Sequence, residues 1–393
     1  MRFHHSKAAI SLLATAITIS LLTSSPILLA AEGTPVPKAP VALTPPMGWD
    51  SWYHYRCTIT EQIVEDNADA IAGSGLRNVG YQYVILDDCW QGGRDPKGAL
   101  ISDPKRFPHG IKALADFVHG YGLKFGLYSS LGEKTCAGNI GSQDFEQLDA
   151  NTFAGWGVDY VKYDNCAYTK PGDEIQRRVE AMSRSLHNTG RPIVFSISAG
   201  VFQPWQAAAA HLNRTGADIQ DNWPVMLNRF DHNATFAKFA HPGFWNDPDV
   251  LDMNGAMTAT EYRTYFSLWA ISAAPLILGN DVVNMAWQNA AIVSNTDVIG
   301  VDQDPSGIQG YKVKEQLPGL QVWARPLADH SWAVVLLNRT TSAAPMQVYW
   351  KDLSLNKPQA IVRDLWLQTG VGVFQEKYST SVDAHGVVFI RVY

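Results

Sequence analysis

The chain has 393 residues, of which 31 are lysine or arginine and 37 are aspartate or glutamate, so its formal net charge is -6. The basic residues are dispersed and form no stripe that could follow a phosphate backbone, which excludes nucleic acid as an expected partner. The 13 tryptophans, 15 tyrosines and 15 phenylalanines are typical of a large buried core, and flat aromatic faces also stack on sugar rings.

The first 31 residues have the pattern of a secretory signal peptide. Arg2 and Lys7 precede an apolar stretch at 8–22, and small residues follow at Ala30 and Ala31. The apolar stretch is too short to span a bilayer comfortably, so we expect cleavage and export, with an uncleaved signal anchor as the alternative. The expected location is secreted or periplasmic. No later segment offers the ~18 consecutive apolar residues of a membrane helix, so no membrane association is expected after signal removal.

Residues 32–46 are rich in proline and are expected to be extended. From 47 to 306 the sequence alternates short β-rich apolar runs with amphipathic helical stretches. The eight predicted strands are 47–52, 83–90, 124–130, 160–166, 192–199, 216–223, 244–252 and 275–282. The predicted helices include 61–74, 110–121, 144–155, 173–188 and 260–273. This alternation favours parallel pairing, and eight such units in roughly 250 residues predict an α/β fold, a (β/α)₈ TIM barrel.

The last part of the chain has a different pattern. From residue 307 onward, helical periodicity gives way to short alternating runs such as LQVWARPL, SWAVVLLNR and GVVFIRVY. Such runs, broken by Gly, Pro, Asn and Asp, are typical of antiparallel strands. We therefore predict a C-terminal antiparallel β-sandwich domain over 307–393.

Four carboxylates lie at predicted strand ends: Asp87 and Asp88 in YVILDDCW, Asp164 in YVKYDNC and Asp218 in GADIQDNW. TIM-barrel enzymes collect their catalytic groups at the carboxyl ends of the strands, and two carboxylates facing each other across a sugar can cleave a glycosidic bond. The adjacent Asp87 and Asp88 could instead bind Ca²⁺, but the chain has no EF-hand-like loop. The predicted strand ends carry no histidine clusters, so no metal site is expected.

Several long motifs occur in a characteristic order: MGWDSW, DDCW, KTCAG, DANTFAGWGVDYVKYDNC, FWNDPDVL and SLWAISAAPLILGNDV. From about Leu43 to the C-terminus they resemble glycoside hydrolase family 27, the α-galactosidase and α-N-acetylgalactosaminidase family. The resemblance implies a retaining exo-glycosidase on a barrel with a C-terminal β domain. It also implies that no metal or organic cofactor is needed, and that the substrates are α-galactosyl oligosaccharides or glycoconjugates. A non-catalytic carbohydrate-binding protein on the same barrel is the alternative from another class.

The resemblance assigns the catalytic pair. Asp164 occupies the place of the nucleophile, and Lys162, two residues earlier on the same strand face, is expected to help keep it ionised. Asp218 falls at the acid/base position, which requires a raised pKa at the start of the cycle. Asp221 is the alternative to Asp218 in this role. Arg214 matches an arginine that contacts the sugar near its 2-position.

Other residues match the family's binding positions. Asp87 and Asp88 resemble the pair that binds galactose hydroxyls, and Trp52 resembles the platform beneath the ring. Tyr128 resembles a hydroxyl group close to the nucleophile. Because Trp90 and Trp223 also adjoin candidate carboxylates, we expect them to stack on sugar as well.

The remaining matches concern disulfides and turns. Cys57 with Cys89, and Cys136 with Cys166, match two family disulfides, which export permits. Asp247 and Asp249 in FWNDPDVL are interpreted as mainly structural, because a DPD turn is a good cap.

One segment departs from the family pattern. Where α-galactosidases have Cys-Glu-Trp or Cys-Asn-Trp, this chain reads FSISAGVFQPWQ, with Ser198 at the Glu or Asn position and Ala199 at the Trp position. That loop reads the sugar's 2-substituent, so galactose, N-acetylgalactosamine and, within the family, L-arabinopyranose all remain open as substrates. We expect galactosides to be the best substrates, with loosened selectivity at C2. The sequence does not predict an oligomeric state.

Overall fold

The computed structural model describes residues 1–4, 39–166 and 168–393, and the described residues from 39 onward belong to one compact unit. The predicted signal peptide lies outside the described residues except for its first four positions, as do residues 32–38 of the proline-rich segment. Within the described part of the chain, no helix is long and apolar enough to cross a membrane.

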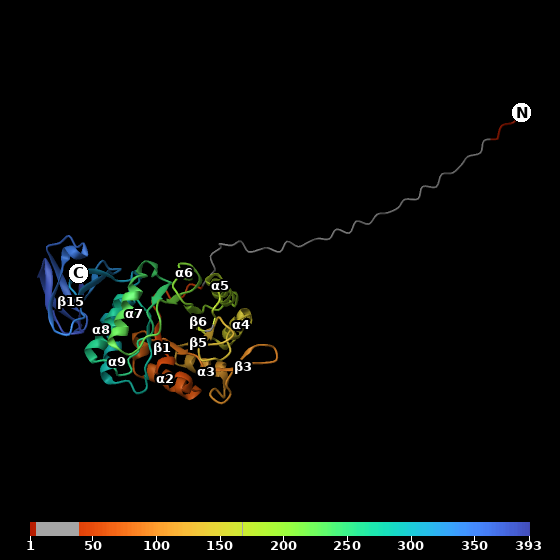
Figure 1. Cartoon of the computed structure of the whole chain (residues 1–393), viewed down its shortest axis with the longest axis horizontal. Coiled ribbons are helices and arrows are strands. Elements are labelled where there is room, and N and C mark those ends of the chain that lie inside the picture. The colour runs from red at the N-terminus through yellow and green to blue at the C-terminus, as the bar shows by residue number, and fades with distance from the viewer. Residues whose placement is uncertain (5–38, 167) are drawn as a thin grey trace. The chain divides into compact units, whose positions relative to one another are not determined.

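Eight parallel strands form the centre of the larger domain, with β1, β5 and β6 visible inside a ring of helices in Figure 1. The strands are β1 (Met47–Asp50), β2 (Tyr83–Leu86), β5 (Lys124–Ser130), β6 (Tyr160–Asp164), β7 (Val194–Ser198), β8 (Leu212–Arg214), β9 (Trp245–Asp247) and β10 (Leu276–Leu278). Hydrogen bonding follows the order β10-β1-β2-β5-β6-β7-β8-β9. A parallel bridge between Leu251, four residues after β9, and Leu278 in β10 joins the two ends of this order. The sheet therefore closes into the predicted barrel.

Helices follow the strands and cover the outside of the barrel. They are α1 (Trp52–Tyr55), α2 (Glu61–Gly73), α3 (Gly110–Gly120), α4 (Glu146–Trp156), α5 (Gly172–Asn188), α6 (Gln206–Ala209), α7 (Trp223–Ala234), α8 (Ala259–Ile271), α9 (Trp287–Val293) and α10 (Thr296–Asp302). The apolar stripe of α3, from Ile111 through Leu114 and Ala115 to Val118, is buried against the sheet side, as helical spacing requires. A short hairpin of β3 (Gln91–Arg94) and β4 (Leu100–Ser102) follows β2.

The predicted strand at 216–223 is wrong. The strand at this place in the barrel is β8, which ends at Arg214, and 216–222 form a loop that leads into α7. Asn222 caps α7 by accepting a hydrogen bond from the Val225 N–H at 3.0 Å. Ile219 made the segment look like a strand, but its side chain is buried from within the loop. The sequence of β8, LNR, has a single apolar residue and so lacks the β-rich apolar run that marked the other strands.

The C-terminal domain is the predicted antiparallel β-sandwich. Its strands are β11 (Tyr311–Leu317), β12 (Leu320–Pro326), β13 (Trp332–Asn338), β14 (Ala344–Tyr349), β15 (Gln359–Asp364), β16 (Thr369–Gln375), β17 (Lys377–Val382) and β18 (Val387–Val392). Six of them form a sheet in the order β11-β12-β13-β18-β15-β16, and β14 pairs with β17. Strand alternation separates the faces: Val322 and Val334 belong to the core of this domain, whereas Trp323 and Val335 belong to the barrel's core. Strands β12 and β13 of the large sheet are therefore buried on both faces, whereas its edge strands β11 and β16 are largely exposed.

Polar and aromatic contacts also join the two domains. The Arg339 guanidinium lies 2.6 and 2.8 Å from the two carboxylate oxygens of Asp231 on α7. The ring of His385 stacks on Trp223, with centroids 4.5 Å apart and planes at 12°. The C-terminal domain thus supports α7, the helix that follows the loop carrying Asp218.

Candidate active site

A cavity of about 670 Å³ opens at the carboxyl ends of the barrel strands. All nine residues predicted to catalyse or to bind substrate line it: Trp52, Asp87, Asp88, Tyr128, Lys162, Asp164, Ser198, Arg214 and Asp218. They come from six different strands or the loops that follow them, so the barrel closure brings together residues as far as 166 positions apart. The volume lies within the range of small-molecule sites.

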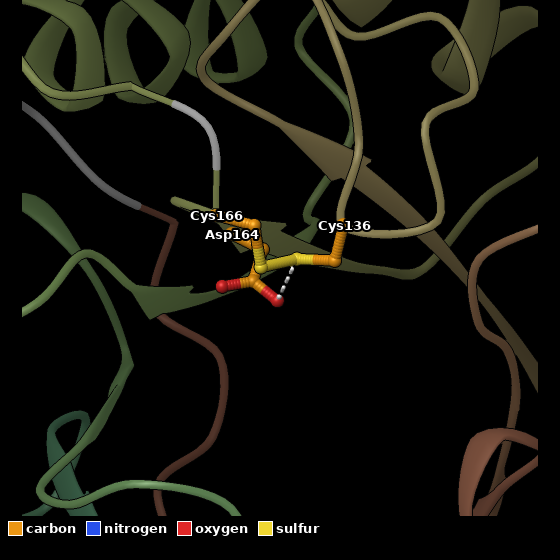
Figure 2. A group of neighbouring side chains, drawn as sticks. All are labelled: Cys136, Asp164 and Cys166. Atoms are coloured by element: carbon orange, nitrogen blue, oxygen red, sulfur yellow. Dashed lines mark hydrogen bonds between the residues drawn. A yellow bond between two sulfur atoms is a disulfide. The ribbon is translucent and has the colours of Figure 1, made fainter.

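Asp164 ends β6 and lies against the disulfide of Cys136 and Cys166, as Figure 2 shows. Its Oδ1 accepts a hydrogen bond from the Asn165 N–H at 2.8 Å, and its Oδ2 accepts one from the Tyr128 hydroxyl at 3.2 Å. The Oδ2 atom is also 3.3 Å from Sγ of Cys136. Because the two sulfurs are bonded to each other, neither is a free thiolate that could bind a metal beside Asp164.

Lys162 was expected to help keep Asp164 ionised, but the structure pairs it with two other carboxylates. The ammonium Nζ lies 2.6 Å from Oδ2 of Asp87 and 3.2 Å from Oδ2 of Asp50. Burial works to lower the pKa of Lys162, but the two carboxylates outweigh it and raise the pKa above its usual value. Lys162 therefore stays charged and joins β1, β2 and β6 beneath the pocket. Sequence reasoning missed Asp50, although it lies at the end of the first predicted strand in the MGWDSW motif.

Asp88 is held by the loop that follows β5. Its Oδ2 accepts from the Ala137 N–H at 2.8 Å, and its Oδ1 accepts from Nδ2 of Asn139 at 3.0 Å and from the Cys89 N–H at 2.6 Å. Oδ1 of Asp87, the oxygen that does not contact Lys162, accepts a hydrogen bond from the Asp88 N–H at 2.7 Å. Both carboxylates are buried, and each has a fixed orientation because both of its oxygens are hydrogen-bonded.

Asp218 lies in the loop after β8, not on a strand, and its side chain is 74% exposed. Its Oδ1 is 3.0 Å from Nη2 of Arg214. The expected raised pKa is not found in the open pocket: partial burial works to raise the pKa of Asp218, but the Arg214 charge and hydrogen bond outweigh it and lower the pKa. Asp221 accepts hydrogen bonds from the Tyr262 hydroxyl at 2.7 Å and the Ala256 N–H at 2.9 Å, and it does not line the cavity. These contacts favour Asp218 over Asp221.

Two family models match this chain. The model described as alpha galactosidase A matches residues 44–304, and the model described as alpha galactosidase C-terminal beta sandwich domain matches residues 318–392. The chain belongs to glycoside hydrolase family 27. An alpha-galactosidase from Oryza sativa subsp. japonica is 45% identical over 87% of this chain and 83% of its own length. An alpha-N-acetylgalactosaminidase from Rattus norvegicus is 39% identical over 81% of this chain and 82% of its own. The crystal structure of alpha-galactosidase I from Mortierella vinacea superposes with a TM-score of 0.85 at 37% identity, covering 90% of this chain and 97% of that one.

Both disulfides predicted from the family 27 resemblance are present. Cys57 pairs with Cys89 and Cys136 pairs with Cys166, with Cα atoms 5.2 and 4.9 Å apart. The first joins the segment after α1 to the residue that follows Asp88. The second joins the loop after β5 to the chain just beyond Asp164. Each disulfide therefore restrains a loop directly beside the pocket.

Of the three tryptophans expected to stack on sugar, only Trp52 lines the pocket of this family 27 chain. Trp90 is fully buried and donates its Nε1–H to the Tyr128 carbonyl at 2.9 Å. Trp223 begins α7 and packs on His385 of the C-terminal domain. Adjacency in sequence did not distinguish these cases, because neighbouring residues at a strand end point in different directions.

The segment that departs from the family pattern forms part of the pocket wall. Ser198 lines the cavity and is the register partner of Asp164 on the neighbouring strand. The expectation that Ala199 lines it too is wrong: Ala199 is buried, and the wall continues through Gly200, Val201 and Phe202. Val201 is 82% exposed.

Further lining residues that the sequence did not predict include Tyr53, Val201, Phe202, His232 and Phe236. The ring of Phe202 packs 4.6 Å from that of Phe236. The only available signal was a pair of apolar residues in a loop directly after a strand, which is weak by itself.

Proposed function

We propose that this chain is a secreted or periplasmic α-galactosidase that hydrolyses terminal α-D-galactosyl residues by double displacement. The observation that carries the proposal is the pocket at the barrel mouth, which Asp164 and Asp218 line together with the buried Asp87 and Asp88 and with Lys162, whose side chain is 13% exposed. The 45% identity to the rice alpha-galactosidase supports the choice of sugar. Two disulfides and the predicted signal peptide support an oxidising compartment outside the cytoplasm.

In the first step, a carboxylate oxygen of Asp164 attacks the anomeric carbon and the bond to the aglycone oxygen breaks. Asp218 gives its proton to that leaving oxygen, so a glycosyl ester on Asp164 and a free alcohol result. In the second step Asp218 removes a proton from water, which attacks the anomeric carbon and releases Asp164 with the configuration retained. For this mechanism the two carboxyl groups are expected to lie about 5 to 5.5 Å apart when substrate is bound.

The proton on Asp218 follows from changes in its surroundings. In the open pocket its side chain is 74% exposed, so a bound glycoside would displace water from it and raise its pKa. Once Asp164 has become a neutral ester, one negative charge nearby is gone and the pKa of Asp218 falls again. Asp218 is thereby suited to act first as acid and then as base.

Recognition of the sugar is assigned to the residues beneath and beside it. Ionised carboxylates only accept hydrogen bonds, which suits Asp87 and Asp88 to the donating hydroxyls of galactose. A sugar that lacks a matching donor would leave an acceptor unpaired at a cost of about 1 to 3 kcal/mol. Trp52 supplies a flat face for the ring, and Arg214 is placed to contact the 2-position.

A second candidate activity is removal of terminal α-N-acetylgalactosamine. The short side chain of Ser198 leaves room in the wall beside Asp164, and the rat alpha-N-acetylgalactosaminidase is 39% identical to this chain. β-L-Arabinopyranosidase activity, on a sugar that lacks galactose's hydroxymethyl group, is the remaining alternative within the family.

Activity on matched nitrophenyl α-galactoside, α-N-acetylgalactosaminide and β-L-arabinopyranoside tests the proposal. We expect the α-galactoside to be hydrolysed with the highest kcat/KM. A wild-type protein that prefers the N-acetyl sugar would overturn the choice of galactose, and a protein inactive on all three would favour a carbohydrate-binding role.

The Asp218→Ala variant tests the acid/base role. It should keep its first step on a dinitrophenyl galactoside, whose leaving group needs no proton, and lose it on a galactosyl disaccharide. Azide should then restore turnover by attacking the glycosyl ester, giving galactosyl azide of retained configuration. Equal losses on both substrates without azide rescue would mean that Asp218 is not the acid/base.

A further inference from the structure

Asp249, in the loop after β9, does not line the main pocket, yet its carboxylate gathers donors from three other elements. Its Oδ2 lies 2.7 Å from Nη2 of Arg214 on β8 and accepts the Ile219 N–H at 2.8 Å. The same oxygen accepts a hydrogen bond from the Tyr53 hydroxyl on α1. Its Oδ1 accepts the N–H of the next residue, Val250, at 2.8 Å. The side chain is 1% exposed, and it also borders a small cavity lined by Asp50, Lys162 and Asp247.

The backbone at Asp249 is strained. Its φ angle is +104°, a region that residues with a Cβ atom rarely adopt. Such a conformation persists only where the surrounding contacts determine it, and glycine would relieve it at the cost of the side chain. A carboxylate at a strained position indicates that the carboxylate itself is needed there. The turn alone would not require it.

Two of the contacts of Asp249 lead to Asp218. Ile219 is the next residue in the chain after Asp218, so the bond to its N–H holds the loop beside Asp218. The Nη2 atom of Arg214 lies between the two acids, 2.7 Å from Asp249 and 3.0 Å from Oδ1 of Asp218. One guanidinium is therefore shared between a buried carboxylate and an exposed one.

We propose that Asp249 is a positioning residue for Asp218: it anchors the loop that carries Asp218 and, by sharing Arg214, sets how readily Asp218 takes up a proton. The inference rests on the acid/base role proposed above for Asp218. Asp249 does not line the main pocket, so it acts on Asp218 through Arg214, through the loop and through its own charge.

Charge on several elements bears on this pair. The ionisable groups that face Asp249 or Asp218 include Tyr53 from α1, Lys162 from β6, Arg214 from β8, Arg229 from α7, Asp247 from β9, Asp252 from the loop after β9 and Tyr265 from α8. Burial raises the pKa of Asp249, and the charges of Arg214 and Lys162 oppose that rise. Since Arg214 also lowers the pKa of Asp218, removing the charge of Asp249 takes one competing carboxylate from the guanidinium and lowers the pKa of Asp218 further.

The Asp249→Asn variant tests this directly, because asparagine keeps the volume and an accepting oxygen but not the charge. We expect the alkaline limb of kcat/KM against pH, measured on a galactosyl disaccharide, to move about one pH unit toward acid. The first step on a dinitrophenyl galactoside, which needs no acid, should keep its rate. Asp221→Asn is the matched control. Asp221 lies in the loop that carries Asp218 but accepts its hydrogen bond from Tyr262, so the alkaline limb of this variant should stay in place.

An unmoved alkaline limb in folded Asp249→Asn protein would overturn the proposal, as would an equal shift in the control. If Asp249→Asn does not fold by circular dichroism, Tyr53→Phe replaces it. Tyr53→Phe removes a hydrogen bond donated to Asp249 but keeps the negative charge of Asp249. Asp249 then draws more strongly on Arg214, so the alkaline limb of kcat/KM should move slightly toward alkaline pH. A shift toward acid, or none, would contradict the proposal.

The Asp218→Ala experiment separates the two possible failures. If that variant loses activity equally on both substrates and azide does not restore it, the acid/base assignment of Asp218 is wrong, and the proposed role of Asp249 is wrong with it. If Asp218→Ala behaves as expected while the Asp249→Asn limb stays in place, only the positioning role is wrong.

Discussion

The floor and the rim of the pocket are built differently. The floor consists of Asp50, Asp87 and Lys162, which lie on or directly after strands, are largely buried and are ion-paired at 2.6 and 3.2 Å. The rim includes Asp218 and Val201, which lie in loops and are 74% and 82% exposed. The ion-paired groups thus lie inside the barrel, whereas the proposed acid/base residue lies where water and substrate reach it.

The two regions also differ in what supports them. The floor is held by the barrel's own ladder of parallel strands. The rim beside Asp218 continues into α7, which the C-terminal domain holds through Arg339 and His385. His232 and Phe236, at the end of α7 and just beyond it, line the pocket. The β-sandwich therefore contributes to the site by supporting a wall, without supplying a residue to it.

The largest expected effect is a loss of activity on replacing Asp164, the proposed nucleophile. Replacing Asp164 by Asn keeps the volume and removes the nucleophile, so turnover should fall by roughly 10⁴-fold or more while the fold remains. Steady-state kinetics on the nitrophenyl galactoside, with circular dichroism as the folding control, measure this. A variant that still hydrolyses at near the wild-type rate would mean that another carboxylate is the nucleophile.

Next in size is the loss of the buried cation of the floor. Lys162→Met would leave Asp50 and Asp87 buried without their counter-ion, and should lower the free energy of unfolding by about 3 to 5 kcal/mol. Lys112→Met is the matched control, since Lys112 pairs with Asp116 on an exposed face of α3, and it should cost less than about 1 kcal/mol. Urea unfolding followed by fluorescence compares the two. Equal losses of unfolding free energy in the two variants would mean that the ion pairs of the floor stabilise the protein no more than a surface ion pair.

A smaller effect is expected in the wall that joins floor and rim. Ser198→Glu should suppress activity on the N-acetyl sugar about 10- to 100-fold relative to galactoside, because the longer side chain fills the space beside Asp164. Ser198→Ala is the control and should leave the ratio of the two activities unchanged. Kinetics on both nitrophenyl sugars give that ratio. An unchanged ratio in Ser198→Glu would show that Ser198 does not contact the sugar.

The smallest effect concerns pH and stability. Burial, and next to it the charge of Asp249, raise the pKa of Asp247 to about 6, against an opposing Arg214. A carboxyl with a raised pKa binds its proton more tightly in the folded state, so stability should increase by about 2 kcal/mol as pH falls from above 6 to about 4. Asp247→Asn should remove this part of the pH dependence in thermal unfolding. A variant with the wild-type slope would place the titration elsewhere.

The barrel and most of the site could be predicted from sequence because their signals are local. Alternating β-rich and amphipathic segments predicted seven of the eight barrel strands, and motifs around Asp87, Asp164 and the four cysteines identified the family. The remaining strand, Leu212–Arg214, was misplaced because its sequence LNR contains a single apolar residue and is not a recognisable β-rich run. Trp90 and Trp223 were wrongly assigned to the pocket because each adjoins a candidate carboxylate in sequence, and adjacency does not show which way a side chain points.

The sequence by itself determined the fold class, because alternating β-rich and amphipathic segments are a local pattern. It also determined the disulfide pairs and the carboxylates at the barrel mouth, because the motifs that contain them resemble those of family 27. Only the tertiary structure decided the partners of the charges. Lys162 pairs with Asp50 and Asp87, and Arg214 is shared between Asp218 and Asp249. These pairs join residues up to 112 positions apart. The distances that set an electrostatic interaction arise when the barrel closes, and no local pattern records them.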